Sequence, residues 1–114
     1  QTITIDHERF DAYRRNPDFI QHYIFPGGVL PSPGKFLGNA AQQGLTITDE
    51  LFFGPSYAET LRRWQNDFHR AWPEIQELGF DDRFRRMWLY YLCYSEVGFD
   101  TGTTDVAQFT LTRQ

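Results

Sequence analysis

A tyrosine at the expected start of a helix is the residue of this chain best suited to chemistry. Ser56 and Glu59 stand three positions apart, the spacing of a capping box, which predicts a helix whose first residue is Tyr57. Free backbone N–H groups and the positive end of the helix dipole favour an anion at such a position. The phenol can therefore help to hold an anion or a polarised oxygen, and simple packing of the ring is the equal alternative.

Other residue types that often carry chemistry give weaker patterns. The histidines His7, His22 and His69 lie far apart and lack a metal-ligand spacing, so we predict no metal site. The single cysteine, Cys93, lies in an aromatic-rich segment without a nucleophile signature, and we expect it in the core.

The composition describes one folded domain or part of one. The 114 residues are 40% hydrophobic and 18% aromatic, which is too rich in apolar anchors for a disordered chain. The net charge is −4 and all but one of the 11 basic residues are arginine, a balance that disfavours nucleic acid as a partner. No apolar run approaches the roughly 20 residues of a membrane span, and no signal-peptide pattern opens the chain. These features predict a cytoplasmic protein.

Alternating apolar and polar residues predict three strands, at 1–5, 45–53 and 105–112. Helical patterns between the first two strands are typical of a βα unit, which predicts an α/β fold with a mostly parallel sheet. The chain opens at Gln1, already inside a strand pattern and without an initiator Met, which indicates a part of a larger protein.

Short helices are predicted between the first two strands. Asp6 caps the first one, and Pro17 opens a second whose apolar residues, Tyr23 among them, face inward. The segment 25–33 is predicted as a loop by its composition, and at its end Ser32 caps and Pro33 opens a third helix, which ends at a left-handed Gly44.

Two long helices are predicted between the second and third strands. The first covers 57–78, with Pro73 as a kink or a restart and Gly79 as its end. Asp81 caps the second, which runs to about Val97 and carries apolar residues on all sides, so we expect much of it to be buried.

Four segments carry a family resemblance: YIFPGGVLPS (23–32), FGPSYAETLRRW (53–64), RFRRMWLYYL (83–92) and DVAQFTL (105–111). In this order they resemble the cyclopropane-fatty-acyl-phospholipid synthase family, which includes the mycolic-acid methyltransferases. The resemblance covers essentially the whole chain and only the carboxyl-terminal part of such an enzyme.

The resemblance implies the class I, Rossmann-like methyltransferase fold, which binds S-adenosylmethionine at its first strands. The three strands here then correspond to the fifth, sixth and seventh, with the last antiparallel to its neighbours, and four to five helices form an acyl-chain tunnel. Residues 1–114 are thus expected to form the substrate side of the domain. The glycine-rich cofactor motif lies upstream, so this chain alone is not expected to bind S-adenosylmethionine.

The resemblance also implies an activity and a set of site residues. In the family, a cis double bond of a phospholipid acyl chain takes the methyl group, and a bound bicarbonate takes the proton as the ring closes. The matching bicarbonate contacts are Tyr57, the backbone of Ile3, and a histidine position that is occupied here by Gln1. Glutamine forms hydrogen bonds but carries no proton at neutral pH. Bicarbonate binding, a methylene or methyl branch, and another apolar substrate therefore all remain open.

The partners expected for the full-length enzyme are an unsaturated phospholipid and, peripherally, the inner face of a membrane. A homodimer is an open alternative. A hypothesis from a different class is a stand-alone lipid-binding or dimerisation module, motivated by the aromatic-rich helices of a short chain.

Overall fold

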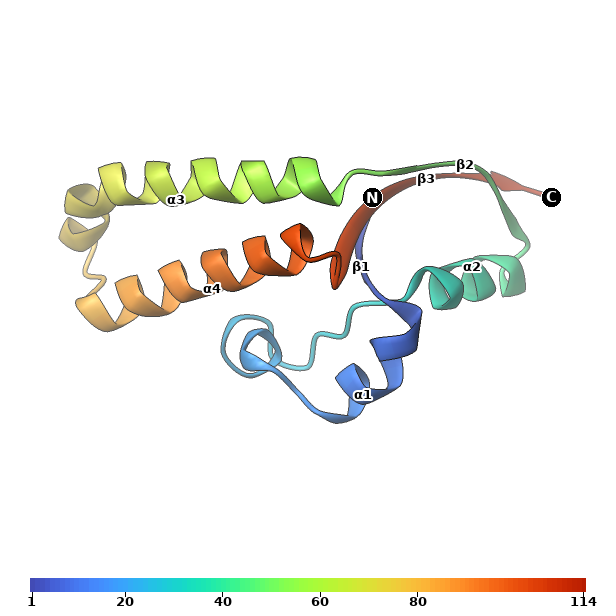
Figure 1. The fold of residues 1–114 in the computed structure, drawn as a ribbon, viewed down its shortest axis with the longest axis horizontal. Coiled ribbons are helices and arrows are strands. Elements are labelled where there is room, and N and C mark those ends of the chain that lie inside the picture. The colour runs from blue at the N-terminus through green and yellow to red at the C-terminus, as the bar shows by residue number, and fades with distance from the viewer.

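A computed structural model describes all residues 1–114 and shows a three-stranded sheet from which two long helices project (Figure 1). The molecule is elongated, with extents of 52 × 28 × 26 Å. In chain order the elements are β1 (Thr2–Ile5), the 3-10 helix η1 (His7–Arg9), α1 (Phe10–Arg15), the π-helix η2 (Ile20–Ile24), α2 (Pro33–Gln42), β2 (Leu45–Phe52), α3 (Gly54–Glu77), α4 (Asp82–Asp100) and β3 (Thr104–Arg113).

The sheet has the order β1-β3-β2, and its central strand, β3, is antiparallel to both neighbours. The expected antiparallel last strand is therefore confirmed. The parallel pairing that the βα pattern predicts is wrong within this chain, because β3 lies between the two strands that run in the same direction. Helices between two strands determine their relative direction, not whether they are neighbours.

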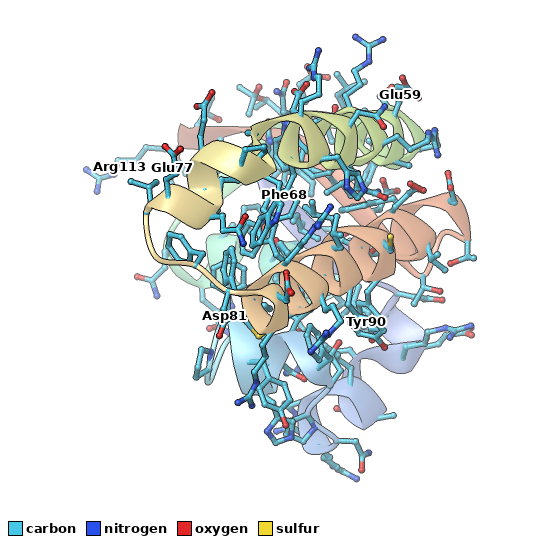
Figure 2. All side chains as sticks on the ribbon, turned by 90° about the vertical axis from the view of Figure 1, so that its left-hand side faces the viewer. Glu59, Phe68, Glu77, Asp81, Tyr90 and Arg113 are labelled. Atoms are coloured by element: carbon cyan, nitrogen blue, oxygen red, sulfur yellow. The ribbon has the colours of Figure 1, made fainter.

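The core lies where α3 and α4 pack on the sheet. Its buried residues are Ala58 and Leu61 from α3, Leu92 and Phe99 from α4, and Val106 from β3. Figure 2 shows Phe68 in the space between α3 and α4, where its ring lies 6.4 Å from that of Phe84. The two helices thus form a hairpin held together by aromatic side chains.

Helix α2 covers the opposite face of the sheet. Val106 and Phe109 are an odd number of residues apart on β3, so their side chains point to opposite faces. Phe109 stacks on Phe36 of α2 with ring centroids 4.6 Å apart. The sheet is therefore covered by the α3–α4 hairpin on one side and by α2 on the other.

Most of the predicted caps are confirmed. Side-chain oxygens of Asp6, Ser32 and Asp81 accept hydrogen bonds from backbone N–H groups at the starts of η1, α2 and α4. Gly44 and Gly79 adopt positive φ angles of 71° and 101° at the expected helix ends. These caps depend on residues at most three positions away, which is why the sequence reveals them.

The start of α3 differs from the prediction. The helix begins at Gly54, so Ser56 lies inside its first turn and Tyr57 is its fourth residue. The cap comes instead from β3, where the Asp105 carboxylate accepts a hydrogen bond from the Gly54 N–H at 2.9 Å. A Cβ at Gly54 would lie 2.5 Å from that oxygen, so the contact requires glycine.

The glutamate of the expected capping box also has another role. Glu59 pairs with Arg62 and Arg63, each at 3.0 Å, on the exposed surface of α3. The local capping pattern was therefore overridden by a carboxylate from a distant strand.

Further expectations are refined or corrected. Helix α3 continues through Pro73 without a restart, and α4 extends to Asp100. The segment after Pro17 becomes helical only at Ile20, and Tyr23 is 65% exposed rather than facing inward.

Burial of α4 was overestimated. Tyr90 and Val97 are 53% and 57% exposed, and Cys93 is exposed as well. Within this chain α4 is covered mainly by α3. The apolar side chains on its other sides therefore remain exposed.

Removal of the Asp105 cap should destabilise the fold more than removal of the Ser56 hydroxyl, which does not cap the helix. We expect Asp105→Ala in the full-length protein to lower the free energy of unfolding by about 1–2 kcal/mol, because the Gly54 N–H loses its acceptor. Ser56→Ala, which removes a hydroxyl from the same turn, should cost less than about 0.5 kcal/mol. Denaturant unfolding of both variants measures the difference, and equal losses would show that Asp105 is not the cap.

Candidate functional site

A cavity of about 630 Å³ lies between β1, the segment 18–30 and the helices α3 and α4. Fourteen of its 22 lining residues are hydrophobic, among them Ile3, Ile20, Phe25, Leu61 and Phe99. Both its size and its apolar lining are typical of small-molecule sites. No lysine, arginine or histidine lines it, and its charged residue is Asp18. The cavity therefore suits an apolar chain better than an anionic group.

Tyr57 and Ile3 are brought together at this cavity. Both residues line it, and both pack against the buried core cluster. The Tyr57 ring makes edge contacts with Phe99 and Trp64, at centroid distances of 5.1 and 5.9 Å. Two of the three residues selected from the sequence thus share one site.

The local electrostatics at Tyr57 differ from the prediction. Its N–H donates to the carbonyl of Phe53, so it is not free to bind an anion. The Gly54 N–H donates to the Asp105 carboxylate. The negative charge of this carboxylate neutralises the positive end of the helix dipole. The backbone N–H groups of Gly54 and Tyr57 are therefore not available to an anion, and the Tyr57 side chain can contact one only through its phenol.

Gln1 does not line the cavity. It precedes Ile3 by two residues and so lies on the same face of the strand, but its side chain is exposed. Its Oε1 accepts a hydrogen bond from Nε2 of Gln108 at 3.0 Å. The structure therefore places Gln1 beside the site and pairs it with another amide.

The cavity wall contains a polar group, formed by Asp18 and Gln21, that was not predicted from the sequence. Asp18 and Gln21 form a reciprocal cap before η2, with distances of 3.0 Å from the Gln21 N–H to Asp18 Oδ1 and 2.8 Å from the Asp18 N–H to Gln21 Oε1. The Tyr94 hydroxyl donates to the other carboxylate oxygen of Asp18 at 3.0 Å. The spacing of Asp18 and Gln21 resembles a capping box and was a usable signal. Nothing in the sequence pairs Asp18 with Tyr94.

Three of the tyrosines that line the cavity have raised pKa values. Burial raises the pKa of Tyr94 to about 12, and the hydrogen bond to Asp18 and the charge of that carboxylate add to the effect. Burial also raises the pKa of Tyr91, with a further contribution from nearby Tyr57. Burial likewise raises the pKa of Tyr13, although the hydrogen bond from the Leu30 N–H opposes the shift. These phenols can therefore act as hydrogen-bond donors at neutral pH.

Residues that could hold a metal or a nucleotide-like cofactor do not gather here. No three His, Cys, Asp or Glu side chains come together anywhere in the structure. No glycine-rich turn follows a strand in this chain, so its residues do not fit the phosphate- and ribose-binding pattern of a Rossmann-like cofactor site. None of the helices combines the length and the apolar character that a membrane crossing requires.

Comparison with known proteins gives matches over nearly the whole chain. The profile of the family described as mycolic acid cyclopropane synthetase matches residues 1–109. Tuberculostearic acid methyltransferase UfaA1 of Mycobacterium tuberculosis is 47% identical over 115 residues, which is 100% of this chain and 27% of that protein. Cyclopropane-fatty-acyl-phospholipid synthase of Escherichia coli K12 is 39% identical over 74 residues, 65% of this chain and 19% of that enzyme.

Solved structures agree with this match. Mycolic acid cyclopropane synthase CmaA1, in a complex with SAH and CTAB, superposes with a TM-score of 0.83 at 30% identity, over 96% of this chain and 41% of that one. Cyclopropane synthase MmaA2 from Mycobacterium tuberculosis gives a TM-score of 0.82 at 27% identity, with the same coverage. The chain thus spans about a quarter of the length of the curated relative that it matches over its whole extent.

The raised pKa of Tyr94 predicts a loss of stability at high pH. Its folded-state pKa of about 12 exceeds the ordinary value of 10, so the unfolded chain releases this proton first and the free energy of unfolding falls between pH 10 and 12. We expect Tyr94→Phe to make this fall less steep, with exposed Tyr23→Phe as the control. Denaturant unfolding at several pH values gives the slopes, and identical slopes for wild type and Tyr94→Phe would contradict the assignment.

Proposed function

The chain belongs to the mycolic acid cyclopropane synthetase family, and we propose that the full-length protein transfers a methyl group from S-adenosylmethionine to the double bond of an unsaturated acyl chain. The observation that carries this proposal is the apolar cavity that contains Tyr57 and Ile3. The contribution of this chain is the substrate side of the site.

The cavity supports an acyl chain as the substrate. Its lining is mostly hydrophobic and includes no cationic side chain that would pair with a phosphate. A phospholipid head group would therefore stay outside while the acyl chain enters. The relative from Escherichia coli, whose name specifies fatty-acyl phospholipids, supports a phospholipid as the donor of that chain.

The cofactor belongs to the part of the domain that this chain does not span. S-adenosylmethionine supplies an electrophilic methyl group, and the CmaA1 structure, which contains SAH, supports its use in the family. Because the residues of this chain do not fit the cofactor, we assign to them the binding of the acyl chain and the handling of charge and protons.

Two features near Tyr57 support that assignment. Addition of a methyl group to a double bond leaves a positive charge on the neighbouring carbon, and the rings of Tyr57, Trp64 and Phe99 can stabilise a cation through their faces. The Tyr57 phenol and the Ile3 backbone can also hold an anionic base such as bicarbonate close to this charge. The base would then accept the proton that must leave.

Gln1 bears on how the proton leaves. A cyclopropane ring and a methylene branch both form by loss of a proton, and an amide does not take up that proton, so the base held by Tyr57 and Ile3 must accept it for either product. Gln1 instead pairs with Gln108. The relative that is 47% identical is named a methyltransferase rather than a cyclopropane synthase, which supports a branched product.

The proposal extends to peripheral contact with a membrane. Leu78 and Phe80, at the turn between α3 and α4, are 77% and 43% exposed. Apolar side chains at the tip of a projecting hairpin are suited to contact with lipid, where an enzyme acting on phospholipids would meet its substrate.

A lipid-binding role without catalysis is the second candidate, favoured by the apolar cavity in a chain that has no cofactor motif of its own. An assay of methyl transfer from labelled S-adenosylmethionine to phospholipid vesicles separates the two candidates. Labelled acyl chains support the enzyme, and binding to lipid without any transfer supports the lipid-binding role.

Tyr57→Phe in the full-length protein tests the catalytic assignment. We expect turnover to fall by about 10²-fold, the typical cost of losing a hydrogen bond to a charged group in a reaction site. The melting temperature should change little, because the ring contacts remain. Tyr91→Phe removes another phenol from the same cavity and should cost far less. Wild-type turnover in Tyr57→Phe would exclude the role.

Gln1→His tests the product assignment. A histidine at this position is the bicarbonate contact that the family resemblance implies, so we expect a better-held base and a larger share of cyclopropane among the methylated acyl chains. Mass spectrometry of the fatty acids, with Gln1→Ala as the control, measures the ratio of products. An unchanged ratio would mean that Gln1 does not determine the product.

A further inference from the structure

One hydrogen bond joins the two sides of the cavity. Tyr94 belongs to α4 and Asp18 lies just before η2, and both line the cavity. The Tyr94 hydroxyl donates to Asp18 Oδ2 at 3.0 Å although the residues are 76 positions apart in sequence. The contact therefore connects the segment 18–25 to the long helical hairpin.

The second oxygen of the Asp18 carboxylate is also held by a hydrogen bond. Asp18 Oδ1 accepts from the Gln21 N–H, and the Gln21 side chain accepts from the Asp18 N–H in return. Gln21 is only 7% exposed, so this cap is shielded from water. A movement of Asp18 would therefore move the start of η2 with it.

The element that this cap begins is unusual. Residues Ile20–Ile24 form a π-helix, closed by a hydrogen bond of 2.8 Å from the Phe25 N–H to the Ile20 carbonyl. Short π-helical turns are rare and occur frequently at functional sites. Ile20, Gln21 and Phe25 all line the cavity, so η2 forms part of its wall.

The other contacts between this wall and α4 are aromatic. The Phe19 ring contacts the Tyr90 ring edge-on, with ring centroids 4.6 Å apart. The ring centroids of Phe25 and Tyr91 are 6.3 Å apart. Figure 2 shows Tyr90 on the side of α4 that faces the blue amino-terminal part of the chain. Such contacts permit sliding, whereas a hydrogen bond to a carboxylate specifies a position.

We propose that Tyr94 is a positioning residue that holds the π-helical wall against α4 and thereby sets the width of the cavity for its acyl chain. The nature of the ligand rests on the proposed function. The hydroxyl stays protonated at working pH, since burial and Asp18 raise its pKa to about 12. Loss of the contact should weaken acyl binding and leave the chemistry at Tyr57 intact.

The test compares Tyr94→Phe with Tyr90→Phe in the full-length enzyme. Both variants keep the ring and remove one hydroxyl from the same face of α4. For Tyr94→Phe we expect the KM for unsaturated phospholipid to rise roughly 5- to 10-fold, as loss of one hydrogen bond implies. The kcat and the KM for S-adenosylmethionine should stay within about 2-fold of wild type, and Tyr90→Phe should match wild type in all three.

Asp18 variants provide a second line of evidence. Asp18→Asn retains an acceptor for the Gln21 N–H and an amide that can donate to the Tyr94 oxygen, so it should bind acyl substrate better than Asp18→Ala. An unchanged KM in Tyr94→Phe, an equal rise in Tyr90→Phe, or a fall in kcat alone would overturn the positioning role.

A binding assay separates this inference from the proposed function. A fluorescent polyene fatty acid reports occupancy of the cavity without any turnover. Weaker probe binding in Tyr94→Phe, with no methyl transfer by the wild type, would refute the function and support the positioning role. Methyl transfer by the wild type with equal probe binding by both proteins would support the function and refute the positioning role.

Discussion

The hydrogen bond from the Gly54 N–H to the Asp105 carboxylate joins the start of α3 to the central strand of the sheet. Everything that faces the cavity from α3 depends on where this helix begins. Since Asp105 caps the helix at Gly54, Tyr57 and Leu61 fall on the side that meets α4 and β1. A start three residues later, as the local capping pattern predicts, would make Tyr57 the first residue of the helix instead of the fourth and so change the direction of its side chain relative to the helix start.

The same contact explains the chemistry available at Tyr57. A carboxylate already neutralises the helix start, so the site relies on side chains and aromatic faces. The cavity combines an apolar lining with phenols that remain neutral. Such an environment accepts hydrocarbon, tolerates a transient positive charge and offers hydrogen bonds without adding a fixed cation. The proposed transfer to an unsaturated acyl chain needs these three properties together.

Local features of the fold were predictable and long-range ones were not. The caps at Ser32 and Asp81 and the turn at Gly79 depend on neighbouring residues, so the sequence alone locates them. The family resemblance supplied the antiparallel last strand, which periodicity could not. The Asp105 and Tyr94 contacts span 51 and 76 positions, and no sequence pattern encodes such distances. In the candidate site, Tyr57 was selected from the capping pattern and the resemblance, and Ile3 from the resemblance alone, whereas the polar group at Asp18 emerged only from the geometry.

The strand order also bears on how the chain folds during synthesis. Strands β1 and β2 leave the ribosome before β3, and within this chain each pairs with β3. These two pairings form only after residues 53–103, which include α3 and α4, have been made. Contacts of such long sequence separation fold slowly and leave strand edges open to other chains. The arrangement that completes the sheet thus creates an interval in which a chaperone would be of most use.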